Sequence, residues 1–184
     1  MTQLRSAPVK FYSPKWREFL SESFVAIDVE TTGLFAKYDR IVEICALKYE
    51  KLNLTEKFVS LVNPGCRVKP DAAAVNNITD GMLKDAPPFK AVADKLLGLI
   101  GNSTVVCHNA PFDISFLEAE FDRAGKYFIC LYADSLDAAR RMFPSLHSHR
   151  LQAVLNHIGH ARPADHRAEA DCEGCAAIVR YILG

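Results

Sequence analysis

Two carboxylates lie close together on a segment that reads as a buried strand. The segment from Phe24 to Leu34 has the sequence FVAIDVETTGL and carries Asp28 and Glu30 two residues apart. Because side chains alternate between the two faces of a strand, both acids emerge on the same face, ~6.6 Å apart along the chain at ~3.3 Å per residue. Two like charges on a hydrophobic strand repel each other and resist removal from water. The pattern therefore predicts that something offsets this cost.

A third acid, Asp113, stands at another position typical of a site. It falls in the first turn of a predicted helix, just after a predicted strand that ends in His108 and Asn109. In open α/β sheets, ligands bind where strands end and helices begin. Taken alone, Asp113 could instead simply favour the positive end of the helix dipole.

A fourth acid, Asp171, lies on the apolar face of the last predicted helix. It shares that face with Cys175, Ile178 and Ile182 and should therefore point toward the sheet. Four inward carboxylates without a matching basic cluster indicate a divalent cation, and oxygen-only ligation favours Mg²⁺ or Mn²⁺ over zinc. Two such ions ~3.5–4 Å apart can clamp the attacking and leaving oxygens of a phosphodiester displacement.

His166 is the candidate general base. It stands five residues before Asp171, and the sequence RPAD at 162–165 indicates a loop before the helix. A histidine near the metals could take the proton of an attacking water, because its pKa lies near the working pH. The alternative is a solvated loop histidine. Four other histidines, at positions 147, 149, 157 and 160, lack such neighbours and are expected to be surface or structural residues.

The elements that must position these residues follow from hydrophobic periodicity. Strands are predicted at 24–30, 40–50, 54–64, 103–109 and 128–135, the second and third forming an antiparallel hairpin. Helices are predicted at 88–101, 111–125, 135–143, 150–159 and 167–184, with two short helical pieces after Pro70. A meander followed by alternating strands and helices indicates a mixed α/β sheet covered by helices.

Composition narrows the class of protein. The 184 residues suffice for one domain with a real core, and the formal net charge is zero. This balance argues against a protein that coats long nucleic acids, but not against an enzyme that grips one end of a strand. The sequence has no secretory signal and no apolar run near the ~20 residues that span a bilayer. Its six cysteines read as packed thiols, so we expect a cytoplasmic protein.

Three motifs carry a resemblance to a known family. The sequences DVETTGL at 28–34, HNAPFD at 108–113 and HRAEAD at 166–171 resemble the three exonuclease motifs of the DEDD superfamily, and the last is typical of its His-type branch. AVNNITDGMLKDAPPF at 74–89 is similar to a segment that relatives of the proofreading epsilon subunit of bacterial DNA polymerase III place between the first two motifs. The resemblance covers roughly residues 23–182.

This resemblance implies a ribonuclease H-like fold with a five-stranded mixed sheet whose second strand is antiparallel to the rest. It implies a 3′–5′ exonuclease with two Mg²⁺ or Mn²⁺ ions that hydrolyses the terminal phosphodiester of single-stranded or frayed nucleic acid, DNA favoured, and releases nucleoside 5′-monophosphates. Asp28, Glu30 and Asp171 would hold the tighter metal, Asp28 would also touch the second, and Asp113 would act largely through water. His166 would be the general base.

The same resemblance implies a set of substrate-binding residues. Those beside the terminal nucleotide would be Thr31, Thr32, Gly33 and Leu34, and those lining the same cleft would be His108, Asn109 and Phe112. Gly33 could equally be a plain turn residue, and Phe112 could equally belong to the core.

Residues 1–22 are expected to form an N-terminal extension and residues 23–184 the exonuclease domain. The extension could dock another protein or cover one edge of the sheet. The sequence ends shortly after Asp171, without a counterpart of the epsilon subunit's polymerase-binding tail, so we expect a stand-alone nuclease whose polymerase partnership is in doubt. Three alternatives remain: a 3′–5′ exoribonuclease, a non-catalytic nucleic-acid-binding module of the same fold, and a small-molecule phosphohydrolase.

Overall fold

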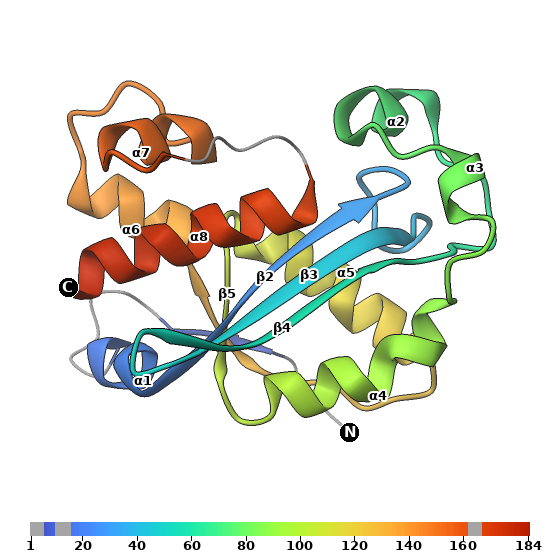
Figure 1. The fold of residues 1–184 in the computed structure, drawn as a ribbon, viewed down its shortest axis with the longest axis horizontal. Coiled ribbons are helices and arrows are strands. Elements are labelled where there is room, and N and C mark those ends of the chain that lie inside the picture. The colour runs from blue at the N-terminus through green and yellow to red at the C-terminus, as the bar shows by residue number, and fades with distance from the viewer. Residues whose placement is uncertain (1–5, 10–15, 162–166) are drawn as a thin grey trace.

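The computed structural model describes residues 6–9, 16–161 and 167–184. At its centre is a mixed sheet in the order β1-β6-β5-β2-β3-β4 (Figure 1). Its strands are β1 (Ala7–Pro8), β2 (Ser23–Thr31), β3 (Ile41–Glu50), β4 (Asn53–Leu61), β5 (Thr104–Cys107) and β6 (Leu131–Asp134). β3 runs antiparallel to β2 and β4, whereas the other pairs are parallel. The predicted five-stranded mixed sheet is confirmed, and β1 adds a sixth strand.

Eight helices occur in the described residues, close to the predicted positions. They are α1 (Trp16–Glu22), α2 (Pro70–Asn76), α3 (Asp80–Leu83), α4 (Phe89–Ile100), α5 (Ala110–Arg123), α6 (Ser135–Met142), α7 (Leu151–His157) and α8 (Ala168–Leu183). Gly101 ends α4 and Gly125 follows α5, both with positive φ, as expected where a helix stops.

The two faces of β2 serve different cores. Val25, Ile27 and Val29 pack with residues of α4 and α5. Phe24 and Ala26 belong to the core on the opposite face, which includes the apolar residues of α6, α7 and α8. The strand alternation therefore directs the even-numbered side chains of β2 toward the side of the sheet that α8 crosses (Figure 1).

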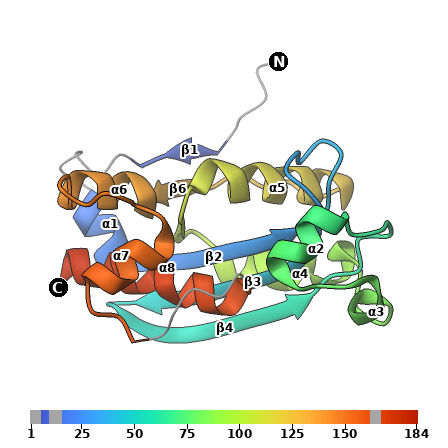
Figure 2. The ribbon, with the colours of Figure 1, turned by 90° about the horizontal axis from the view of Figure 1, so that it is seen from above.

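The N-terminal residues that the structure describes pack against the domain. β1 lies parallel to β6 at one edge of the sheet, and β4 forms the other edge (Figure 2). The backbone N–H of Ala7 donates to the carbonyl oxygen of Cys130 at 3.0 Å. Leu20 of α1 is fully buried in the same core as α8. Of the two roles considered for the extension, β1 performs the covering of a sheet edge.

All six cysteines are free thiols, and Cys45, Cys107, Cys172 and Cys175 are buried. The Cys172 thiol donates to the carbonyl oxygen of Ala26 in β2 at 3.1 Å. Among the residues that the structure describes, no helix has the length and apolar character needed to cross a bilayer.

Candidate active site

Three carboxylates converge at the carboxyl end of β2. Asp28 and Glu30 come from the face of β2 that looks toward α8, and Asp171 comes from the first turn of α8. One ligand oxygen of each lies within 4.8 Å of the other two. Asp171 retains only 9% of its accessible surface. The strand alternation and the helix face predicted from the sequence thus bring these acids together.

The fourth acid reaches the same strand from the other side. β5 pairs with β2 only as far as Ala26, so the later backbone groups of β2 have no strand partner on that side. Asp113, in the first turn of α5 and only 3% exposed, accepts the backbone N–H of Val29 at 3.2 Å. Asp113 is therefore fixed beside the carboxylate group, although its oxygens lie outside the compact set of three.

Burial and mutual repulsion oppose ionisation of these acids. Burial, followed by the negative charges of Asp113, Asp171 and Glu30, raises the pKa of Asp28 well above its usual value. Burial and then Asp171 raise the pKa of Glu30 to about 8, although the amide of Asn76 partly counteracts this. Burial also raises the pKa of Asp113 to about 8, against the hydrogen bond from Val29.

This donor set suits a hard divalent cation. The compact group offers carboxylate oxygens only, which Mg²⁺ and Mn²⁺ prefer over the nitrogen and sulfur ligands typical of zinc. A bound cation would replace the repulsion between the acids with attraction, because it favours their charged forms. Asp28, Glu30 and Asp171 are the residues that could hold it, with Asp113 adjacent.

The start of α8 is anchored to the sheet by an acid that the sequence analysis did not single out. Glu43 of β3 is 3% exposed and accepts the backbone N–H of Ala168 at 3.0 Å. It also receives two hydrogen bonds from the Arg167 guanidinium, at 3.0 and 2.5 Å. Such a bidentate pair fixes the helix end in position and hence the location of Asp171 one turn later. The sequence did contain a signal for this role, because Glu43 is a charged residue within the apolar run of β3.

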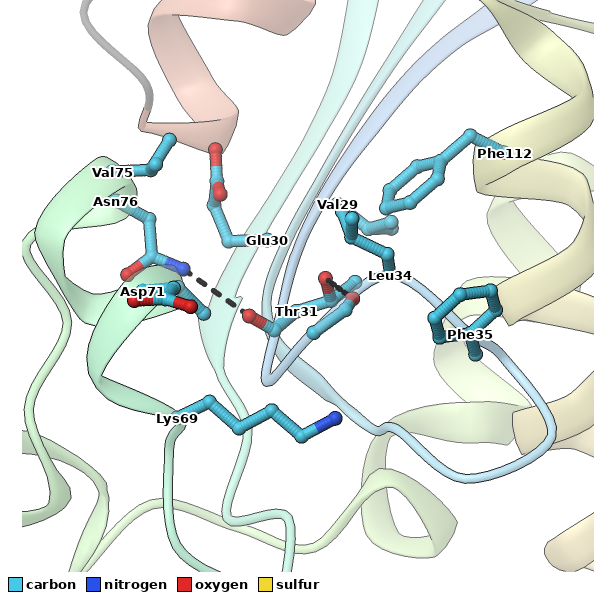
Figure 3. Close-up of a pocket in the computed structure, with 12 residues that line it drawn as sticks. Val29, Glu30, Thr31, Leu34, Phe35, Lys69, Asp71, Val75, Asn76 and Phe112 are labelled. Atoms are coloured by element: carbon cyan, nitrogen blue, oxygen red, sulfur yellow. Dashed lines mark hydrogen bonds between the residues drawn. The ribbon is translucent and has the colours of Figure 1, made fainter.

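An apolar-walled cleft of about 430 Å³ opens beside the carboxylates, between α2 and the loop that follows β2. Figure 3 shows Val75 and Asn76 of α2 on one side, and Leu34, Phe35 and Phe112 on the other. Glu30 lines this cleft and also belongs to the carboxylate group. The cleft therefore leads directly to the acids.

Asn76 connects the two walls of the cleft. Its side-chain amide donates to the carbonyl oxygen of Thr31 at 3.3 Å (Figure 3), and its side-chain oxygen accepts the backbone N–H of Ile78 at 3.0 Å. Asn76 lies in the segment 74–89 that carries part of the family resemblance, but its role was not predicted. Thr31 lies 45 positions away in the sequence, so only the folded chain reveals this contact.

The loop after β2 is held by a buried carboxylate, Asp39. This group accepts the backbone N–H of Phe35 at 3.0 Å, the Thr32 hydroxyl at 3.3 Å and the Lys69 ammonium at 2.7 Å. Gly33 packs so closely on it that an added Cβ atom would lie 2.6 Å from Oδ2 of Asp39. The glycine therefore allows a close approach that no larger residue permits without movement.

A second buried acid ties the same loop to α5. Glu120 is only 1% exposed and accepts hydrogen bonds from Arg40, at 2.5 and 3.0 Å, and from Arg123, at 3.1 Å. Arg123 also donates to the carbonyl oxygen of Ala36 at 2.5 Å. The loop that carries Leu34 and Phe35 is thus closed at its base by paired charges.

Comparison with known proteins agrees with this geometry. The exonuclease family described as RNase T matches residues 25–179. The epsilon subunit of DNA polymerase III from Treponema pallidum (strain Nichols) is 36% identical over 164 residues, which cover 88% of this chain and 76% of that protein. The chain belongs to this exonuclease family, within the DEDD superfamily of 3′–5′ exonucleases.

Other relatives contain a comparable exonuclease domain within much larger proteins. The PolC-type DNA polymerase III of Bacillus cereus is 35% identical over 173 residues, which cover 94% of this chain but 12% of that protein. Among solved structures, E. coli exonuclease I with a dT13 oligonucleotide has a TM-score of 0.77 at 20% identity, covering 88% of this chain and 41% of the other. Exonuclease X with 5′ overhanging duplex DNA has a TM-score of 0.69 at 25% identity, covering 86% and 90%.

The predicted substrate-binding residues of the exonuclease lie in three locations. Thr31, Gly33, Leu34 and Phe112 line the apolar cleft. Thr32 is not among the described residues that line it. Instead, the Thr32 hydroxyl lies within the loop, where it donates to Asp39 and accepts the backbone N–H of Arg40 at 3.0 Å.

His108 and Asn109 line a separate hollow on the α6 and α7 side. The His108 ring is engaged at both nitrogens, with Ser135 and with the carbonyl oxygen of His149, each at 2.9 Å. His166 lies outside the described residues, so its role as general base stays a prediction.

Proposed function

We propose that this exonuclease removes nucleotides from the 3′ end of single-stranded or frayed nucleic acid, with DNA favoured. The observation that carries the proposal is the position of Glu30, which lines the apolar cleft and also belongs to the compact carboxylate group. A terminal nucleotide in the cleft would therefore have its phosphate beside the acids.

The cleft walls suit a base of any identity. Leu34 and Phe35 are 75% and 66% exposed, and they lie together at the cleft rather than singly on the surface. Together with Phe112 and Val75 they offer flat and apolar surfaces on which a base can stack, and stacking tolerates every base. The volume of about 430 Å³ falls within the range of ~300–1,000 Å³ typical of small-molecule sites.

We assign Asp28, Glu30 and Asp171 as the residues that hold a divalent metal, with Asp113 supporting a second. When bound, Mg²⁺ or Mn²⁺ would lower the pKa of water and neutralise charge on the phosphate. The chain itself contributes the rigid placement of the acids through Glu43 and Val29, and the exclusion of bulk water by buried surroundings.

The proposed reaction is a simple displacement at phosphorus. Oxygen of a water molecule forms a bond to phosphorus, and the bond from phosphorus to the 3′ oxygen of the preceding nucleotide breaks. His166 accepts the proton of the water, and the departing 3′ oxygen ends as the hydroxyl of a strand shortened by one residue. The product is a nucleoside 5′-monophosphate.

The names of the similar proteins support DNA as the favoured polymer. Two of them are DNA polymerase III subunits or enzymes, and exonuclease X was solved with duplex DNA. The free thiols fit the expected cytoplasmic environment, where disulfides are rare.

A digestion ladder tests the proposal. Single-stranded DNA and RNA carrying a 5′ label are incubated separately with the protein and Mg²⁺ or Mn²⁺. We expect stepwise shortening of DNA in preference to RNA, with nucleoside 5′-monophosphates as the released product. Faster shortening of RNA would support the exoribonuclease alternative, and unchanged bands with both polymers and both ions would contradict the proposal.

The role of His166 is tested by His166→Ala. We expect turnover to fall by about 10²–10⁴-fold, the range typical for loss of a general base. Metal binding should remain as in the unmodified protein, because the carboxylates are intact. The rise in melting temperature on addition of Mn²⁺ measures this binding. Near-normal turnover would show that another group accepts the proton.

A further inference from the structure

A second hollow, of about 660 Å³, lies on the opposite side of the start of α5 from the apolar cleft. We name it the basic hollow and define it by His108, Asn109, Arg140, His147, His149 and Arg150. Arg140 comes from the last turn of α6, and Arg150 immediately precedes α7. In a chain with zero net charge, this gathering of cationic and histidine side chains is local rather than general.

The two arginines of the basic hollow differ from the structural arginines elsewhere. Arg40 and Arg123 pair with buried Glu120, and Arg141, next to Arg140 on α6, pairs with Asp137 at 3.0 Å. Arg140 and Arg150 are exposed, and neither guanidinium makes an ion pair or hydrogen bond with any residue that the structure describes. Both are therefore available to an anionic ligand.

The walls of the basic hollow are held in place by histidines. Nε2 of His108 must carry hydrogen, because its partner, the carbonyl oxygen of His149, can only accept. The His149 ring in turn donates from Nε2 to the carbonyl oxygen of Phe143 at 2.9 Å. These bonds fix the segment 143–150 against the end of β5, so the hollow that Arg150 lines is formed before any ligand arrives.

An acid that contacts Asn109 of this hollow, Asp134, is already engaged. Asp134 accepts the backbone N–H groups of Asn109 and Leu136, each at 2.9 Å, as the N-cap of α6. The Asp134 carboxylate is therefore occupied by backbone N–H groups. No carboxylate is among the described residues that line the hollow, so none competes there for Arg140 and Arg150.

The basic hollow and the apolar cleft are lined by neighbouring positions of one segment, at the start of α5. His108 and Asn109 line the hollow, Phe112 lines the apolar cleft, and the next residue, Asp113, accepts the backbone N–H of Val29 in β2. Figure 1 shows α2 above the carboxyl end of β2 and α7 farther to the left, above α8. A strand whose last nucleotide occupies the cleft and passes the start of α5 therefore reaches the basic hollow next.

We propose that the basic hollow binds phosphate groups of the strand being digested, on the 5′ side of the terminal nucleotide, chiefly through Arg140 and Arg150. This inference rests on the proposed function. Guanidinium groups match the geometry of phosphate oxygens and bind them bidentately. The hollow would hold the strand without reading its sequence, because phosphate contacts position a nucleic acid whereas base contacts specify it.

The test compares a long and a minimal substrate with the double variant Arg140→Gln/Arg150→Gln. The long substrate is a single-stranded oligodeoxynucleotide, and the minimal one is the 4-nitrophenyl ester of thymidine 5′-monophosphate, which has no nucleotide beyond the reacting phosphate. We expect KM for the oligonucleotide to rise about tenfold or more, as for loss of exposed charge-assisted hydrogen bonds. Hydrolysis of the ester should change less than about twofold, because the ester does not reach the hollow. A twofold change is well below the effect of losing one such hydrogen bond.

Salt dependence provides an independent readout. Binding of a fluorescent oligonucleotide, measured by anisotropy with Ca²⁺ in place of the activating ion, should weaken with added salt. In the double variant, the slope of log affinity against log salt should become shallower by about 0.7 for each phosphate of a single strand that the protein no longer neutralises. Arg180→Gln is the matched control, because it removes the same charge from the far end of α8 and should leave KM and the slope unchanged.

Each other outcome contradicts the inference in its own way. Equal losses on both substrates would indicate general damage to the active site, and an unchanged KM and slope would show that the hollow binds no phosphate. If the unmodified protein hydrolyses neither substrate, the proposed function fails, whereas the anisotropy measurement still decides whether the basic hollow binds the strand.

Discussion

The active-site carboxylates carry an electrostatic cost in the absence of cations. The pKa values of Glu30 and Asp113 are raised to about 8, first by burial. In an unfolded chain these groups titrate near pH ~4. Between these values the folded state binds more protons than the unfolded state, so the free energy of unfolding falls as the pH rises through this window.

We therefore expect the metal-free protein to melt at a lower temperature at about pH 8 than at about pH 6, as this linkage requires. Mn²⁺ should raise the melting temperature more at the higher pH, because the ligands must lose their protons to bind it. Differential scanning calorimetry with a chelator and then with Mn²⁺ measures both effects. A metal-free melting temperature that rises over this range would contradict the assigned pKa shifts.

Asp28→Asn removes the acid that is repelled by all three of the others. We expect the metal-free variant to be more stable than the unmodified protein by about 0.5–2 kcal/mol, the usual gain when a strained functional residue is replaced. It should lose turnover on oligonucleotides and the melting-temperature response to Mn²⁺. Urea denaturation with a chelator checks the stability, and an unchanged Mn²⁺ response would exclude Asp28 as a ligand.

The convergence of Asp28, Glu30 and Asp171 could be predicted from the sequence, because strand alternation and helix periodicity determine which way each side chain points. The location of His108 could not. Its partners, Ser135 and His149, lie 27 and 41 positions away in the chain, and no local pattern announces such pairs.

At the scale of elements, the loop between β2 and β3 is the part of the site whose shape depends most on one small residue. An alanine Cβ at position 33 would lie 2.6 to 2.7 Å from three atoms of the Asp39 carboxyl group. That group cannot easily yield, because Phe35, Thr32 and Lys69 all bind it. The loop would therefore have to move, together with Leu34.

We expect Gly33→Ala to lower the free energy of unfolding by about 1–3 kcal/mol, as overpacking usually does. It should also raise KM for oligonucleotides, because Leu34 and Phe35 shift relative to α2. Gly98→Ala is the control, because Gly98 lies within α4 with nothing within 4 Å of the added Cβ. This variant should gain about 0.5–1 kcal/mol of stability. Denaturation curves and steady-state kinetics of both variants check this, and normal stability of Gly33→Ala would show that Asp39 moves freely.

The boundaries of the predicted elements agree closely with the structure wherever periodicity is strong, as in α4 and α5. The charged network at the base of the loop was missed. Glu120 follows Phe116 by four positions and Leu117 by three, so it falls on the apolar face of α5. That placement was a usable signal for a buried acid with a partner, but its partner Arg40 is 80 positions away.

At the scale of the whole molecule, the N-terminal strand changes what the sheet exposes. Without β1, the backbone of β6 would form an open edge, and open edges invite pairing with other chains. No periodicity could predict a strand as short as Ala7–Pro8. Within residues 1–22 the sequence indicates only a short helix in SPKWREFL, and the structure has α1 there, at Trp16–Glu22.

Removal of residues 1–9 should lower the free energy of unfolding by about 1–3 kcal/mol. The lost hydrogen bonds are worth ~0.5–1.5 kcal/mol each, and the entropy cost of ordering the segment offsets part of this sum. The hydrogen bonds removed include those from Ala7 to Cys130, from Val9 to Tyr132 and from Ser6 to Glu118. Light scattering should reveal more self-association, while turnover persists because β1 lies at the outer edge of the sheet. A truncated protein with full stability would show that this strand contributes nothing.

The alkylation rate of the buried thiols beneath β2 reports how often the protein opens locally. Cys66 is exposed and should react at once with an alkylating reagent, whereas Cys172 and Cys175 of α8 are shielded, and burial raises their pKa values so that little reactive thiolate exists. Alkylation of these two can proceed only as the layer between β2 and α8 separates. The rate at which Cys172 and Cys175 are alkylated, followed by mass spectrometry of the peptides that carry them, would therefore report how often the layer beneath the catalytic centre opens.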